Sequence, residues 1–123
     1  MVRWGATTLW MMLAATAGSA AELTLDTAYG NQQGCAYLQS GVLDSDELVY
    51  LTRRELGKYA SGCEFVAVQA DSHGNQRAQG ICHYEGDEVL GAEDFVITPP
   101  DAAGLVRVFA ANAEIWAELE PCS

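Results

Sequence analysis

The sequence predicts a mainly β protein: a small disulfide-bonded β-sandwich or barrel of about six or seven short strands, with one short helix near residues 53–60. Short apolar runs separated by turn signals at intervals of about eight to twelve residues are typical of such folds. Four cysteines suit stabilising disulfides, and no repeat, low-complexity segment or interdomain linker divides the chain.

Residues 1–21 predict a cleaved signal peptide, and residues 22–123 predict a single β-rich domain. A basic start ending at Arg3 precedes an apolar run over residues 6–17, and residues 18–21 are small, as at a cleavage site. The apolar run is shorter than the roughly 20 residues that a membrane-spanning helix needs. We therefore expect a periplasmic or extracellular protein with no stable membrane insertion after cleavage.

The charge of the expected domain is strongly negative. Cleavage removes Arg3 and no acidic residue, so five basic residues face 17 acidic ones and the net charge falls from −11 to −12. Such a charge repels nucleic acid and anionic lipid, and it favours solubility or a cationic partner. We predict no nucleic-acid binding; the expected partner is a cationic protein or a cell-envelope component.

The first elements of the domain are short. Residues 22–29 alternate apolar and polar side chains, which predicts a first strand or an extended lead-in. Residues 30–34 are interpreted as a loop, residues 35–38 as the next strand, and residues 44–47 as a polar turn or helix start.

Residues 48–59 allow two interpretations. Residues 48–51 have the composition of a strand, and Thr52 with Glu55 resembles a capping box that opens a short helix ending at Gly62. The alternative is one longer helix that starts at Asp44. We favour a strand followed by the helix near residues 53–60.

A central hairpin from Cys63 to Tyr84 organises the expected fold. Two strands flank the polar turn Asp71-Ser72-His73-Gly74-Asn75. A four-residue turn would place Cys63 directly opposite Cys82, whereas a five-residue turn pairs Ala70 with Gln76 and sends the two sulfurs to opposite faces. We favour the five-residue turn.

The C-terminal part predicts further strands. A strand around residues 94–98 is stopped by Pro99-Pro100-Asp101, because proline supplies no donor to a strand ladder. Residues 105–109 and 114–119 form a second hairpin around the turn at residues 110–113. All these segments fit one compact, β-rich domain.

The four cysteines predict two structural disulfides, because exported domains fold in oxidising compartments. Their spacings of 28, 19 and 40 residues contain no Cys-x-x-Cys pair, so a zinc site is not expected. If the helix near residues 53–60 returns the chain toward the first strands, the bridges are Cys35–Cys63 and Cys82–Cys122. The pairing Cys63–Cys82 with Cys35–Cys122 remains the alternative.

Neither histidine predicts a catalytic site. His73 lies in the exposed hairpin turn, where Asp and Gly are common for backbone reasons. His83 follows Cys82 and points to the opposite face of the strand. We predict no catalytic residues; the alternative hypothesis is a small hydrolase that uses His73 or His83 with a carboxylate.

No cofactor or metal site is predicted. The acidic segments 44–47 and 85–88 lack the ligand spacing of a helix-loop-helix calcium site and are interpreted as solvated turns. Trp116 is the candidate partner contact, because it faces outward if Ile115, Ala117 and Leu119 face the core. No nucleophile elbow, phosphate-binding glycine loop or zinc-protease motif occurs.

These features resemble a broad class: small, acidic, disulfide-bonded exported β-domains of bacteria, which include periplasmic inhibitors of lysozyme. The resemblance rests on composition, the leader and the cysteines, so it implies a class and transfers no site residue. We therefore expect a non-catalytic binding or accessory module, inhibitor-like if its partner is a basic protein.

Overall fold

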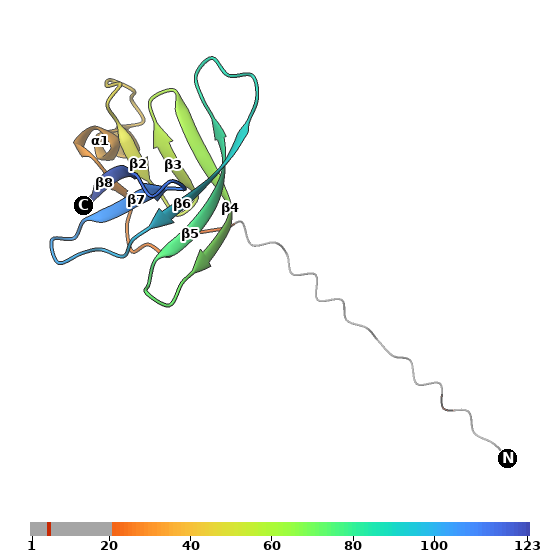
Figure 1. The fold of residues 1–123 in the computed structure, drawn as a ribbon. Helices are drawn as coiled ribbons and strands as arrows, with labels where there is room; N and C mark the ends of the chain where they lie inside the picture. Colours follow the sequence, from red (N-terminus) through yellow and green to blue (C-terminus); the bar gives the residue numbers. More distant parts are fainter. Residues whose placement is uncertain (1–4, 6–20) are drawn as a thin grey trace.

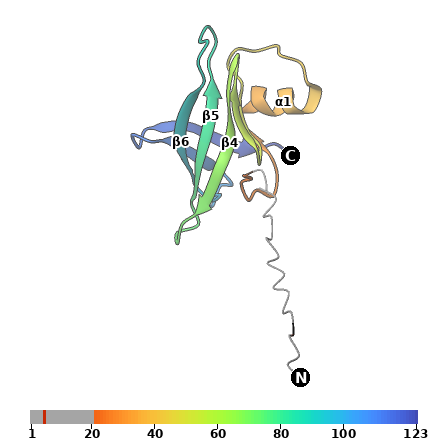
Figure 2. The same cartoon turned by 90° about the vertical axis from the view of Figure 1, so that its right-hand side faces the viewer.

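Eight antiparallel strands close into a barrel in a computed structural model that describes Gly5 and residues 21–123. Each strand pairs with the next along the chain, and β1 pairs with β8 to close the sheet (Figures 1 and 2). The strands are β1 (Tyr29–Gly30), β2 (Val49–Leu51), β3 (Glu55–Lys58), β4 (Ser61–Ala70), β5 (Gln76–His83), β6 (Gly91–Ile97), β7 (Val106–Ala110) and β8 (Ile115–Pro121). The predicted fold class is confirmed.

The predicted leader, residues 1–21, lies outside the described residues except for Gly5 and Ala21. Within the part that the structure describes, no helix combines the length and apolar character needed to cross a membrane. The segment from Glu22 is the extended lead-in that the sequence allowed. Leu23 and Leu25 are buried in the core, and the Leu23 N–H donates to the Arg53 carbonyl at 2.7 Å.

The helix near residues 53–60 was a wrong prediction: Glu55–Lys58 forms β3. The Thr52 hydroxyl does accept hydrogen bonds from the N–H groups of Arg54 and Glu55, at 3.3 and 3.2 Å, as a capping residue would. The bonds close a turn instead of a helix, because Leu56 pairs with Leu51 and both side chains enter the core. Pairing and burial therefore outweigh the local capping signal.

The described helix is α1 (Gln32–Ser40), where a loop and a strand had been expected. Asn31 caps its first turn by accepting a hydrogen bond from the Gly34 N–H at 2.7 Å. Gly41 ends it in the left-handed region at φ 71°, and its N–H donates to the Tyr37 carbonyl. The helix packs on the outside of the barrel against β1 and β2 (Figures 1 and 2).

The hairpin of β4 and β5 has the predicted five-residue turn, since Ala70 pairs with Gln76. A β-bulge then changes the register: Ala67 pairs with Gln79, Phe65 pairs with Gly80, and Val66 opposes no residue. The extra residue places Cys63 directly opposite Cys82 despite the longer turn.

The favoured disulfide pairing is therefore corrected. The structure joins Cys63 to Cys82 inside the barrel and Cys35 to Cys122, instead of Cys35 to Cys63 and Cys82 to Cys122. The first bridge follows from the bulge in β4. The second ties α1 to the chain after β8, where the Cys122 N–H also donates to the Ala28 carbonyl at 2.9 Å.

Inward-facing side chains of the strands form one core. Its buried members include Leu51, Leu56, Phe95 and Val108, and the disulfide of Cys63 and Cys82 lies among them. No buried polar side-chain atom of the described residues lacks a hydrogen-bond partner. The interior is thus packed, and any recognition surface must lie on the loops or on the outer wall.

Candidate binding surface

Both histidines are exposed on the part of the chain that the structure describes. His73 is exposed in the β4–β5 turn, and the Asp71 carboxylate accepts its backbone N–H at 2.8 Å. The N–H of His73, followed by the amide groups of Asn75, lowers the pKa of Asp71. Asp71 thus organises the turn. His83 is exposed at the end of β5, and neither histidine lines a hollow found among the described residues.

The Cys63–Cys82 disulfide has one acidic neighbour. The Glu93 carboxylate lies 3.9 Å from the sulfur of Cys82, and the three side chains come within 4.8 Å of one another. Both sulfurs are already bonded to each other, so this group offers an ion one carboxylate and no thiolate. The cluster is consistent with a structural bridge.

Trp116 packs against the core, and a bulge in β8 is the reason. Val108 pairs with Ala117 and Phe109 pairs with Ile115, so Trp116 opposes no residue. Its ring meets Phe95 edge-on at 5.9 Å, and the Lys58 ammonium lies 3.7 Å from its ring centroid. Ile115, with 57% of its surface exposed, is the outward-facing apolar residue of this strand.

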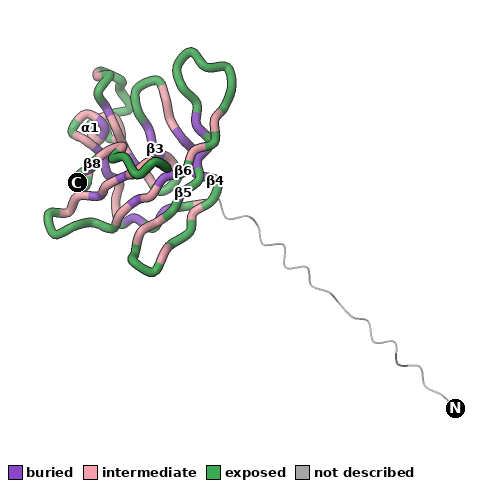
Figure 3. Tube along the Cα trace, viewed as in Figure 1, coloured by how far each residue is buried: buried purple, intermediate pink, exposed green. Residues whose placement is uncertain are grey.

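A different surface gathers groups suited to binding, and we term it the loop rim: residues 41–48 between α1 and β2, residues 59–60 between β3 and β4, and residues 84–90 between β5 and β6. The three loops lie at the same end of the barrel in both views, with the β3–β4 turn between the other two (Figures 1 and 2). Figure 3 shows them as mainly exposed.

Large apolar side chains concentrate on the loop rim. Among the described residues nine large hydrophobic side chains are exposed, and six of them lie on these three loops. Two adjacent pairs dominate: Val89 and Leu90 are 77% and 64% exposed, and Val42 and Leu43 are 58% and 55% exposed. Tyr59 and Tyr84 complete the set. Such a grouping is characteristic of interaction surfaces.

Carboxylates surround these apolar pairs. The loop rim contains six acidic residues and no lysine or arginine; they are Asp44, Asp46, Glu47, Glu85, Asp87 and Glu88. Within the described residues none of the six carboxylates accepts a hydrogen bond or joins an ion pair. Burial, together with hydrogen bonding to Glu93 and the charges of Glu93 and Asp87, raises the pKa of Tyr84 to about 12, so its phenol stays neutral beside these acids.

Several of the acids elsewhere are already engaged. Glu22 pairs with Arg54 at 2.9 Å, and Asp101 and Glu118 pair with Arg107 at 2.9 and 3.4 Å. The Arg53 guanidinium donates to the Leu25 carbonyl at 3.1 Å. Three of the four described arginines thus serve internal contacts, and no ion pair within the described residues compensates the carboxylates of the loop rim.

A hollow of about 930 Å³ is lined by residues of β4 to β7 and of the turn after β7. Val96 and Phe109 contribute apolar surface, and the charged residues beside it, Arg77 and Asp94, are exposed. No polar side chain is buried in it, so it lacks the fixed polar groups that orient a small ligand.

Comparisons of the chain with protein-family models, with curated proteins and with solved structures find no match. The assignment of the loop rim as a candidate binding surface therefore rests on its geometry alone. The sequence did contain a signal for it, because Val42-Leu43 and Val89-Leu90 are apolar pairs placed directly beside acidic turn residues. The acidic segments had been predicted as solvated turns, and the apolar pairs beside them were missed.

Proposed function

We propose that this protein is an exported, non-catalytic binding module whose loop rim docks onto a cationic protein. The observation that carries the proposal is the coincidence, on three loops at one end of the barrel, of six exposed apolar side chains with six unpaired carboxylates. Apolar groups supply contact area, and the negative field speeds and orients the encounter with a basic surface.

Export is supported by the leader in the sequence and by two disulfides, which persist in oxidising compartments. A closed barrel fixes the strand ends from which the three loops project, which limits the ordering cost of binding. The location proposed is the periplasm or the cell exterior.

Calorimetric titration against lysozyme and cytochrome c, two basic proteins, with an acidic albumin as reference, tests the function. We expect binding to a basic protein that weakens as salt rises, because exposed charges are screened. Inhibition of lysozyme activity, assayed in parallel, reports whether docking blocks that enzyme's cleft.

The paired variants locate the contact. Asp87→Asn with Glu88→Gln should weaken binding by about two- to thirtyfold, since each of the two exposed ion pairs contributes ~0.2–1 kcal/mol. The matched control, Glu114→Gln with Glu120→Gln, removes the same charge from exposed positions outside the loop rim. Absence of binding to either basic protein, or equal weakening by both double variants, contradicts the proposal.

A further inference from the structure

We infer that the loop rim recognises a basic amphipathic peptide segment, in which cationic and apolar side chains alternate within a few residues. This inference rests on the proposed function and specifies its ligand. It starts from the two apolar pairs, Val42-Leu43 and Val89-Leu90, whose four side chains are each more than half exposed. Solubility gains nothing from such pairs on loop tips, whereas a ligand with apolar side chains would remove them from water.

The spacing of charge and apolar groups defines the ligand. Asp44, Asp46 and Glu47 follow the first apolar pair within the same loop, and Glu85, Asp87 and Glu88 precede the second pair. Each apolar pair is therefore flanked by three carboxylates. A complementary chain presents lysine or arginine next to leucine-like side chains, which is the pattern of a basic amphipathic segment.

The lack of internal partners for the carboxylates of the loop rim strengthens the assignment of a cationic ligand. Some acids outside the loop rim hold an arginine or turn N–H groups, as Asp101 and Asp71 do, whereas all six on the loop rim have no partner within the described residues. Lys58 adjoins the loop rim, but its ammonium lies over the Trp116 ring. Cations supplied by a ligand thus meet carboxylates that are not already compensated.

Other occupants fit less well. A purely cationic, polar partner would leave the two apolar pairs without contacts, and six carboxylates repel the phosphates of nucleic acid and anionic lipid. Insertion of the apolar pairs into a neutral lipid surface would bring the carboxylates to zwitterionic headgroups, whose zero net charge gives six carboxylates little attraction. Charge and apolar area together favour the peptide.

Two synthetic peptides of equal length and charge test the inference, one built from lysine and leucine and the other from lysine and serine. Titration of the full protein should show the lysine–leucine peptide binding at least tenfold more tightly. Val89→Ser with Leu90→Ser should weaken that peptide by about tenfold or more, as truncation of central contact residues does, and leave the lysine–serine peptide unchanged. Thermal unfolding should be unaffected, because both side chains are exposed.

The matched control is Val66→Ser with Ile115→Ser, which removes two exposed apolar side chains outside the loop rim. Equal binding of both peptides, or equal loss in the control, overturns the inference. Rim-dependent binding to phosphatidylcholine vesicles without peptide binding also overturns it and assigns a membrane surface. If the natural protein binds lysozyme or cytochrome c but neither peptide, this inference fails and the proposed function stands. If the natural protein binds neither the peptides nor the basic proteins, both fail.

Discussion

Gly34 illustrates how closely α1 approaches the barrel wall. A Cβ atom at this position would collide with the backbone carbonyl of Val49, which is part of β2 and cannot rotate away. Gly34 is the buried residue of α1. The capping residue Asn31 contacts the same point of β2, because its side chain accepts a hydrogen bond from the Val49 N–H at 3.0 Å. The absence of a side chain therefore sets the distance between helix and sheet.

Gly34→Ala should lower the free energy of unfolding by about 1–3 kcal/mol, the usual cost of overpacking. Alanine favours a helix over glycine by ~1 kcal/mol, so any loss occurs against that gain. Urea unfolding measures the change. Gly91→Ala is the control, because no atom lies within 4 Å of its added Cβ. Unchanged or increased stability of Gly34→Ala would show that the helix can move off β2.

Single residues also explain why the sequence did not predict the disulfide pairing or the orientation of Trp116. The alternation of β5 and the turn at residues 71–75 predicted the hairpin correctly, because both are local signals. The bulge at Val66 has no local signal, because valine is an ordinary strand residue and nothing in the neighbouring sequence marks the extra residue there. That one residue decided which cysteines face each other, and the second bulge at Trp116 likewise turned the indole toward the core.

At the scale of elements, capping residues were a poorer guide to secondary structure than strand pairing and burial. Thr52 forms the hydrogen bonds of a cap at the entrance to a strand, while Asn31 and Gly41 bracket a helix whose composition had suggested a loop and a strand. Asn before and Gly after a nine-residue segment are usable signals for α1. The conflict at residues 53–60 is resolved by the pairing of β2 with β3, which local composition does not reveal.

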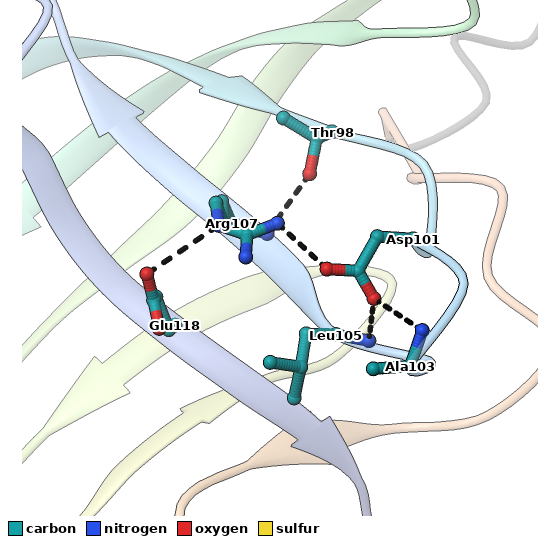
Figure 4. Close-up of polar contacts among 6 residues, drawn as sticks. All are labelled: Thr98, Asp101, Ala103, Leu105, Arg107 and Glu118. Carbon is teal, nitrogen blue, oxygen red and sulfur yellow. Dashed lines mark hydrogen bonds and ion pairs between the residues drawn. The ribbon is translucent and has the colours of Figure 1, made fainter.

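One carboxylate fixes the conformation of the loop between β6 and β7. Asp101 accepts the N–H groups of Ala103 and Leu105, each at 2.9 Å, and pairs with the Arg107 guanidinium at 2.9 Å (Figure 4). Arg107 also reaches Glu118 on β8, and its backbone N–H donates to Thr98 at 2.9 Å. The Leu105 N–H, then the Arg107 side chain, lower the pKa of Asp101. The loop thereby anchors the β7–β8 side of the barrel.

Asp101→Asn should destabilise the protein at neutral pH, and the difference from the natural chain should vanish in acid. A carboxyl whose folded pKa is lowered stabilises the fold above its unfolded pKa of about 3.9. That contribution is lost as the pH falls through the lowered folded value. Thermal unfolding at neutral pH, near pH 5 and near pH 3 should show a gap that holds over the first two conditions and shrinks in the third.

The control for this titration is Asp94→Asn, on the outer wall of β6, whose carboxylate makes no hydrogen bond within the described residues. It should leave the thermal midpoint nearly unchanged at all three pH values. A gap for Asp101→Asn that persists undiminished in acid would mean that the loop depends on the shape of residue 101 and not on its charge.

On the scale of the whole molecule, the proposed binding surface and the joined ends of the domain lie at opposite ends of the barrel. The loop rim faces solvent at one end, whereas the lead-in around Leu23 and the C-terminal residues come together at the other, where the Cys122 N–H meets Ala28. The fold class and the acidic character were predictable, because they follow from strand spacing and composition. The loop rim was not, because three segments distant in the sequence meet only once the barrel closes.

The two disulfides act on this architecture over very different lengths of chain. Cys35–Cys122 joins residues 87 apart in the sequence and so encloses seven of the eight strands, whereas Cys63–Cys82 joins residues 19 apart within one hairpin. In the chain-entropy description, the long bridge stabilises the fold by about 4.6 kcal/mol and the short bridge by about 3.3 kcal/mol. The short bridge also fills the core, so its removal adds a cavity cost.

Replacing Cys35 and Cys122 with alanine, with the other bridge intact, should therefore lower the free energy of unfolding by about 4–5 kcal/mol. Because both cysteines are only partly buried, the loss reports the cross-link more than packing. Urea unfolding should also show a steeper denaturant dependence, since the released chain exposes more surface when it unfolds. A loss below about 1 kcal/mol would contradict the pairing or its long-range role, and non-reducing peptide mapping of the natural chain would separate those two outcomes.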